Sequence, residues 1–176
     1  MSKLISIIPL IAADETLLAE MSYQAIFIPA GGNPPPRTIL AEPGLRKYFA
    51  AFGTLVGDIG CKAVDHATGH AVGAAWVRLL QGEARGYGYV NDDTPELSIA
   101  IDPAYRGQGI GQLLMTALFA AVAPHFAAIS LSVWLENPAY RLYQRLGFTL
   151  LPAVGDGPDV TMIKYLNAKE SGVIAK

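Results

Sequence analysis

The most informative stretch of the chain is LSIAIDPAYRGQGIGQLL, residues 97–114. Leu97, Ile99 and Ile101 alternate with small or polar residues, and this alternation predicts a strand. A short loop follows, and then three alternate glycines precede an apolar pattern with helical spacing. The free N–H groups and positive dipole of a helix N-terminus bind anions, and glycine lets a phosphate approach the main chain. The stretch therefore predicts a phosphate site between a strand and a helix.

Two common nucleotide motifs fit this stretch poorly. A P-loop needs Gly-Lys-Ser/Thr, which does not follow these glycines, so that motif is excluded. A dinucleotide fingerprint would begin with Gly107 and Gly109, but Gln112 then stands where a third glycine or alanine belongs. Glu136, beyond the next expected strand, could imitate the acid that binds a ribose. A nicotinamide-dependent oxidoreductase therefore stays as the less favoured alternative.

A third pattern, Gln/Arg-x-x-Gly-x-Gly/Ala, is filled completely by Arg106, Gly109 and Gly111. This segment resembles the loop that binds the acyl-CoA pyrophosphate in the GNAT superfamily of N-acetyltransferases. Taken alone, a glycine-rich connection that only packs a helix would explain these residues as well. A second segment is therefore needed to decide between the two interpretations.

The second segment is the run NPAYRLYQRLGF, residues 137–148. Asn137 suits a helix N-cap, Pro138 suits the first helical position, and Gly147 suits the helix end. The run resembles the second GNAT signature, Asn…Ala-x-x-Leu-Tyr-x-x-x-Gly-Phe, although Asn137 precedes Tyr143 by six residues where many members have seven. The order of the two segments also suits the family, and the resemblance covers about residues 61–165.

Composition limits the other function classes. The chain has 176 residues, of which 52% are hydrophobic and 16% charged, so we expect one folded domain over 1–166 and a flexible tail over 167–176. The net charge is −2 and no basic run occurs, which gives nucleic acid and anionic membranes no electrostatic support. No run approaches the ~18 apolar residues of a membrane span.

The cysteine and histidine content indicates the compartment and the absence of a metal site. A single cysteine, Cys61, excludes an internal disulfide framework and suits a reducing compartment, so we expect a cytoplasmic protein. The three histidines show no metal-ligand spacing with Cys61, and we predict no metal. The apolar run after Lys3 faintly imitates a signal peptide, but an initial strand and helix explain it better because Pro9 interrupts it.

The rest of the chain reads as alternating strands, helices and loops. Beyond the two motif segments, the expected elements are a loop at 29–36, a helix at 43–52, strands at 61–65 and 71–80, a long loop at 82–95, and strands at 129–134, 148–154 and 159–165. The family resemblance implies an α/β (α+β) fold, in which a mixed, mostly antiparallel sheet is flanked by helices on both faces.

The resemblance also implies an activity. We expect transfer of an acetyl group from acetyl-CoA to a primary amine, by direct attack in a ternary complex. The acceptor is either a small molecule or a peptide, and the sequence does not decide between them. A non-catalytic acyl-CoA-binding regulatory protein is the main alternative. The oligomeric state stays open, with a homodimer among the alternatives.

The resemblance assigns roles to particular residues. Tyr143 is the expected general acid for the CoA thiolate, and Glu96 is the expected general base, acting directly or through water. The main chain of the strand at Ile99, Ala100 and Ile101 would pair with the pantetheine arm. The expected pyrophosphate loop comprises Arg106, Gly107, Gln108, Gly109, Ile110 and Gly111, and Asn137 and Tyr143 are further expected cofactor-binding residues. Aromatic residues would surround the acceptor side, although most belong to the core: Tyr23, Phe27, Phe49, Phe52, Trp76, Tyr87 and Tyr89.

Overall fold

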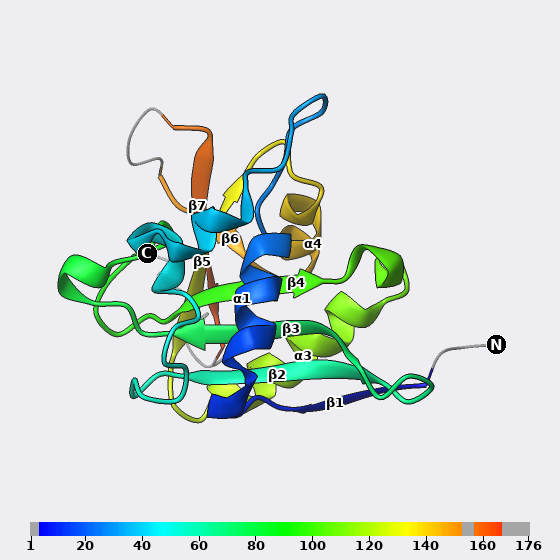
Figure 1. Cartoon of the computed structure of the whole chain (residues 1–176). Coiled ribbons are helices and arrows are strands. Elements are labelled where there is room, and N and C mark those ends of the chain that lie inside the picture. The colour runs from blue at the N-terminus through cyan, green and yellow to red at the C-terminus, as the bar shows by residue number, and fades with distance from the viewer. Residues whose placement is uncertain (1–3, 153–156, 167–176) are drawn as a thin grey trace.

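A single mixed sheet organises the chain (Figure 1). The structure is a computed structural model that describes residues 4–152 and 157–166. The seven strands lie in the order β1-β2-β3-β4-β5-β7-β6, and every neighbouring pair is antiparallel except β4 and β5. Their bounds are β1 Ile5–Pro9, β2 Ile59–Asp65, β3 Ala71–Arg78, β4 Glu96–Ile101, β5 Ala128–Trp134, β6 Thr149–Leu150 and β7 Asp159–Tyr165. The expected mixed, mostly antiparallel sheet is confirmed.

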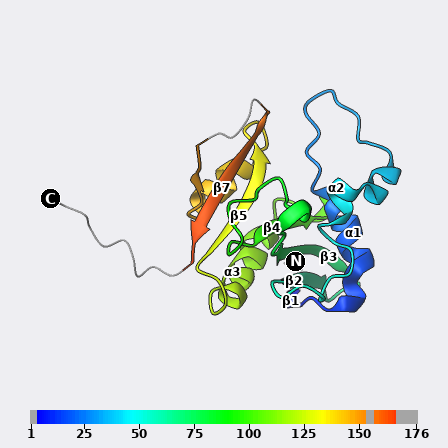
Figure 2. The ribbon, with the colours of Figure 1, turned by 90° about the vertical axis from the view of Figure 1, so that its left-hand side faces the viewer.

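Helices cover both faces of this sheet, as expected (Figures 1 and 2). On one face lie α1 (Glu15–Gln24) and the short α2 (Pro43–Arg46), and on the other lie α3 (Ile110–Val122) and α4 (Ala139–Arg145). Strand alternation sends apolar side chains into two separate cores. Leu18 of α1 packs with Trp76 and Ala100 in one core, whereas Leu114 of α3 packs with Leu97 in the other.

The sheet opens between its two parallel strands. The only paired position of β4 and β5 is Glu96 with Ser130, next to a hydrogen bond from the Ser130 N–H to the Pro95 carbonyl. Figure 2 shows β5 and β7 running in a direction different from that of β2 and β3. Beyond Glu96 and Ser130 no further residues of β4 and β5 pair, so the two strands separate there.

The main chain of β4 faces this opening at alternate residues. The Asp102 N–H donates to Val72 on the β3 side, and the Pro95 carbonyl accepts on the β5 side. Successive residues of a strand point their N–H and C=O groups to opposite edges, so Ile99 and Ile101 present theirs toward β5. Because β5 has already turned away, the polar groups of Ile99 face the opening.

Two expected elements were wrong in extent. The helix expected at 43–52 extends only over α2, Pro43–Arg46. Beyond it, the carbonyls of Lys47, Ala50 and Ala51 accept from the buried Arg78, and Ala51 has a left-handed φ of 52°, which ends the helical pattern. The strand expected at 148–154 pairs as β6 over two residues only. Residues 153 and 154 of that expected strand and the whole tail from 167 lie outside the described residues.

Among the helices that the structure describes, none has both the length and the apolar character needed to cross a membrane.

Candidate active site

The glycine loop enters α3 in the conformation that the sequence predicts. Gly107 and Gly109 have φ values of 74° and 80°, in the left-handed region that glycine adopts without steric cost. Gly109 immediately precedes Ile110, the first residue of α3, so the free N–H groups of the first helical turn follow it. Positions where side chains would project from Gly107 and Gly109 are open space. The loop therefore leaves room for an anion against its main chain.

Arg106 ties the loop to two neighbouring elements. Its Nε donates to the Ile101 carbonyl at 3.0 Å and its guanidinium also reaches the Gln24 carbonyl at 3.4 Å. The side chain is exposed and lines a cavity of about 550 Å³. Arg106 thus joins β4 to α1 and places a positive charge at the rim of that cavity.

Two adjoining cavities occupy the opening of the sheet. The larger is lined by Ile99, Ala100, Ile101 and Arg106 among others, and the smaller, of about 340 Å³, reaches Glu96. Six residues line both: Ala25, Ile26, Phe27, Ile99, Asn137 and Tyr143. Gly111 also lines the larger cavity, whereas Gly107, Gln108, Gly109 and Ile110 line neither. The Ile110 side chain packs into the core, and the Gln108 amide donates to the Ala104 carbonyl.

Glu96 is a buried carboxylate with one occupied and one unoccupied oxygen. Its side chain begins β4 and the residue is 6% exposed. Oε1 accepts from the Tyr48 hydroxyl at 2.9 Å and from the Gly88 N–H at 2.8 Å, while Oε2 is buried with no partner among the described residues. Burial raises the pKa of Glu96, and the bonds from Gly88 and Tyr48 and the charge of Lys47 oppose this rise. A carboxylate with a raised pKa suits a general base.

The loop at 82–95 covers Glu96 because two of its residues are glycines. A side chain on Gly86 would lie 1.8 Å from Oε2 of Glu96. A side chain on Gly88 would lie 2.6 Å from the main chain of Leu131 in β5. The loop main chain therefore fits against both β4 and β5 at the closed end of the opening, where any larger residue would push it away.

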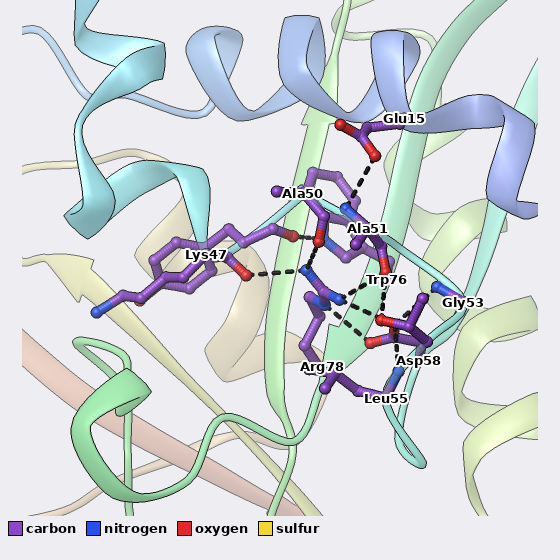
Figure 3. Close-up of polar contacts among 11 residues, drawn as sticks. Glu15, Lys47, Ala50, Ala51, Gly53, Leu55, Asp58, Trp76 and Arg78 are labelled. Atoms are coloured by element: carbon purple, nitrogen blue, oxygen red, sulfur yellow. Dashed lines mark hydrogen bonds and ion pairs between the residues drawn. The ribbon is translucent and has the colours of Figure 1, made fainter.

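The segment that carries Tyr48 is held in place through its main chain, and Figure 3 shows Arg78 bonded to the neighbouring carbonyls of Lys47 and Ala50. The Trp76 indole donates to the Tyr48 carbonyl at 2.8 Å. Arg78 donates to the carbonyls of Lys47 at 2.9 Å and Ala50 at 2.7 Å, and its guanidinium also binds both carboxylate oxygens of Asp58. Both side chains of this ion pair are almost fully buried, so the segment that carries Tyr48 is fixed to β3.

Tyr143 lies on the opposite face of the sheet from Glu96. It belongs to α4, packs edge-on against Phe148 at 5.7 Å between ring centroids, and lines both cavities. Burial raises the pKa of its hydroxyl to about 12. Within the described residues that hydroxyl has no hydrogen-bond partner, and it can donate to a group in the opening.

Asn137 lies just before α4, one residue further from the helix than expected, because Pro138 and not Asn137 occupies the N-cap position. Its Oδ1 accepts from the Ala139 N–H at 2.9 Å, and the helix begins at Ala139 after Pro138. The residue lines both cavities, so the same side chain lies at the helix start and at the opening.

Comparison with known proteins decides the family. A family model for the acetyltransferase (GNAT) domain matches residues 47–150, which is more than half of the chain. The chain belongs to the GNAT acetyltransferases. The expectation of an enzyme of this family is therefore confirmed, and the roles of individual residues remain to be tested.

Solved structures share the fold of this acetyltransferase at low sequence identity. A yncA acetyltransferase from Salmonella typhimurium, solved with acetyl-CoA, is 20% identical and has a TM-score of 0.65, with 97% of this chain and 99% of that chain covered. A phosphinothricin acetyltransferase from Sinorhizobium meliloti, in complex with acetyl-CoA, is 22% identical, with a TM-score of 0.63 and coverage of 98% and 93%. The ribosomal-protein-S18-alanine N-acetyltransferase from Escherichia coli is 19% identical, with a TM-score of 0.62 and coverage of 97% and 99%. A comparison with curated proteins found no match.

Tyr48 is a candidate site residue that the sequence did not predict. The helix expected at 43–52 would contain it, whereas the structure places the Tyr48 hydroxyl against Glu96. The two residues are 48 positions apart, so no local pattern links them. The run Gly86-Tyr87-Gly88 was the available signal, because paired glycines in a long loop indicate close approach of main chains.

Proposed function

We propose that the protein transfers an acetyl group from acetyl-CoA to a primary amine in a ternary complex. The observation that carries this proposal is that Glu96, the open main chain of Ile99 and Tyr143 line one cavity where the sheet separates. A base, an N–H donor and an acid are the groups that acyl transfer from a thioester requires.

The residues around the opening fit the donor. Acetyl-CoA supplies an activated acetyl group on a long polar arm that ends in a pyrophosphate. The main-chain N–H groups at the start of α3 would bind the pyrophosphate, with Arg106 adding charge. The N–H and C=O groups of Ile99 and the N–H of Ile101 would pair with the arm as a neighbouring strand does, while the Ile101 carbonyl already accepts from Arg106. Two similar structures were solved with acetyl-CoA, and this agrees with the expected cosubstrate.

Each reacting group has a role that balances the reaction. The amine nitrogen forms a bond to the thioester carbonyl carbon, and its proton passes to Glu96, directly or through one water. The Ile99 N–H donates to the carbonyl oxygen as negative charge develops there. The carbon–sulfur bond breaks, and the Tyr143 hydroxyl donates its proton to the departing thiolate. Tyr48 is a positioning residue, because it holds Oε1 of Glu96 and leaves Oε2 unoccupied.

The proposal includes a cytoplasmic location and a single domain over 1–166. A single buried thiol at Cys61, hydrogen-bonded to the Leu114 carbonyl, supports a reducing compartment. One sheet that links the described residues from Ile5 to Tyr165 supports the single domain.

Binding of the donor is tested by two matched glycine variants. Gly109→Ala and Gly69→Ala both force alanine into a left-handed conformation with open space around it, at φ values of 80° and 71°. Each should cost roughly 1–2 kcal/mol of stability. Only Gly109→Ala should weaken binding of acetyl-CoA, because Gly69 lies in the turn between β2 and β3, far along the chain from the loop.

The measurement is a thermal shift with acetyl-CoA and with NAD. Saturation at 100 times the dissociation constant adds ~2.7 kcal/mol of stability, which shifts the melting temperature by several degrees. We expect a shift with acetyl-CoA and none with NAD. No shift of the wild-type protein with millimolar acetyl-CoA, or equal affinity in the Gly109→Ala and Gly69→Ala variants, would contradict the proposed donor site.

A further inference from the structure

We propose that the acceptor is a small primary amine with an apolar, aromatic-compatible body and no anionic group. The proposal rests on the proposed function and names the substrate class of the same site. It comes from the smaller cavity, whose walls, charges and unpartnered polar atoms agree with one another.

The walls of this cavity are two pairs of aromatic rings. Tyr48 and Tyr87 stack with their ring centroids 6.3 Å apart, and Phe27 meets Trp134 edge-on at 5.7 Å. All four residues line the cavity, together with the aliphatic side chains of Leu45, Leu131 and Val133. Such walls bury an apolar body favourably, and ring faces attract an ammonium group. The volume of about 340 Å³ suits a small molecule.

The charged side chains that line this cavity are all acidic. Among the described residues that line it, Glu96 and Asp159 carry carboxylates, and there is no lysine, arginine or histidine. The nearest cation to the tyrosine pair, Lys47, lies over the two rings at 5.6 and 5.3 Å, and its ammonium already donates to the Arg85 carbonyl at 2.6 Å. A carboxylate or phosphate on the acceptor would enter this cavity without a free counter-charge, and like charges placed together cost several kcal/mol.

Two residues that line this cavity carry buried polar atoms that lack partners within the described part of the chain. These atoms are Oε2 of Glu96 and the Ser22 hydroxyl on α1. Buried polar atoms are almost always hydrogen-bonded in folded proteins, so each indicates a group that is supplied from elsewhere. An ammonium or amine brings two or three N–H donors and satisfies a carboxylate and a hydroxyl together. Ser22 is thereby assigned to recognition of the amine.

The experiment compares acceptors that differ in one charge. Initial rates are measured with saturating acetyl-CoA for 2-phenylethylamine, L-phenylalanine and L-phenylalanine amide. We expect kcat/KM for 2-phenylethylamine and for L-phenylalanine amide to exceed that for L-phenylalanine by about 100-fold or more, because of the three only L-phenylalanine carries a carboxylate. Equal rates for the three, or faster turnover of L-phenylalanine than of the other two, would overturn the substrate class while leaving acetyl transfer intact.

Binding of acetyl-CoA separates failure of this inference from failure of the proposed function. If acetyl-CoA stabilises the protein but neither 2-phenylethylamine nor the amide is acetylated, the substrate class is wrong. If acetyl-CoA does not bind, the proposed function fails and the substrate class fails with it.

A matched pair of serine variants tests the recognition of the amine. Ser22→Ala and Ser130→Ala each remove a buried hydroxyl without a partner, but Ser130 does not line the cavity. We expect Ser22→Ala to raise KM for 2-phenylethylamine about fivefold or more, with unchanged affinity for acetyl-CoA, and Ser130→Ala to leave KM unchanged. The same KM in both variants would refute the role of Ser22.

Discussion

Tyr48→Phe should move the pH dependence of the reaction without abolishing the fold. The substitution keeps the stacked ring and removes the hydroxyl that donates to Oε1 of Glu96 at 2.9 Å. This bond stabilises the carboxylate form, so its loss raises the pKa of Glu96 beyond the rise that burial already causes. The Gly88 N–H and the charge of Lys47 remain and continue to oppose that rise.

The size of the shift follows from the strength of the lost bond. A hydrogen bond to a charged group contributes about 1.5–3 kcal/mol, and one pKa unit corresponds to 1.36 kcal/mol. The acidic limb of the kcat/KM profile should therefore move upward by about 1–2 pH units. Activity at a pH below the shifted limb should fall, and it should recover as the pH rises. The Tyr87 N–H also loses its acceptor, at a cost of about 1 kcal/mol of stability.

The assay is the pH profile of kcat/KM with a confirmed amine, and Tyr87→Phe is the control. The control removes a hydroxyl from the other ring of the same stacked pair, and that hydroxyl has no contact with Glu96. Its profile should match that of the wild-type protein. If Tyr48→Phe also gives the wild-type profile, then either Glu96 is not the base or Tyr48 does not control its protonation.

Three further substitutions test other parts of the site. Tyr143→Phe should lower kcat by ~10²-fold with unchanged acetyl-CoA affinity, and a wild-type kcat would mean that Tyr143 only packs in the core. Because the pKa of Tyr143 is about 12, its ionisation in the wild-type protein should produce no alkaline limb below pH 10. Glu96→Gln should slow turnover by ~10²-fold. Its stability relative to wild type should improve as pH rises above about 4.5, because the pKa of Glu96 is raised in the folded wild-type protein, which therefore holds a proton that the unfolded chain releases. Wild-type and Glu96→Gln melting temperatures that differ by the same amount at every pH would contradict this. Arg78→Lys should lower the free energy of unfolding by about 2 kcal/mol or more in chemical denaturation, since an ammonium cannot replace the guanidinium that binds Asp58 and the carbonyls of Lys47 and Ala50. An unchanged denaturation midpoint would show that the ion pair does not hold the segment that carries Tyr48.

The elements that the sequence predicted correctly are those set by local pattern. Alternation in β4 and the apolar stripe of α3 each depend on neighbours within a few residues. The same is true of the bond from the Ala139 N–H to Asn137, although the N-cap of α4 is Pro138, one residue later than expected. The helix expected at 43–52 is shorter than predicted because Arg78, a residue of β3, donates to carbonyls in this segment. The helical pattern of the segment itself could not predict a bond from a distant strand.

The candidate site was predictable in part for the same reason. Tyr143 and the glycine loop lie in contiguous motifs, so their residues could be found in the sequence. The partners of Glu96 come from residues 8 and 48 positions away, and they meet it only after the sheet and the loop have folded. The burial of the Ser22 hydroxyl likewise depends on packing between α1 and the sheet, so it could not be predicted from a serine in a helical pattern.

The separation of β4 from β5 also has a mechanical consequence. The four strands β1 to β4 and the three strands β5 to β7 form one sheet, but these two parts are joined at a single paired position, Glu96 with Ser130. They therefore meet along a seam with almost no main-chain hydrogen bonds. Along this seam, we expect amide hydrogens without a main-chain partner, such as that of Ile99, to exchange with solvent without global unfolding. A molecule seated between the strands bridges the seam, and protection of these amides reports how firmly the two parts are joined.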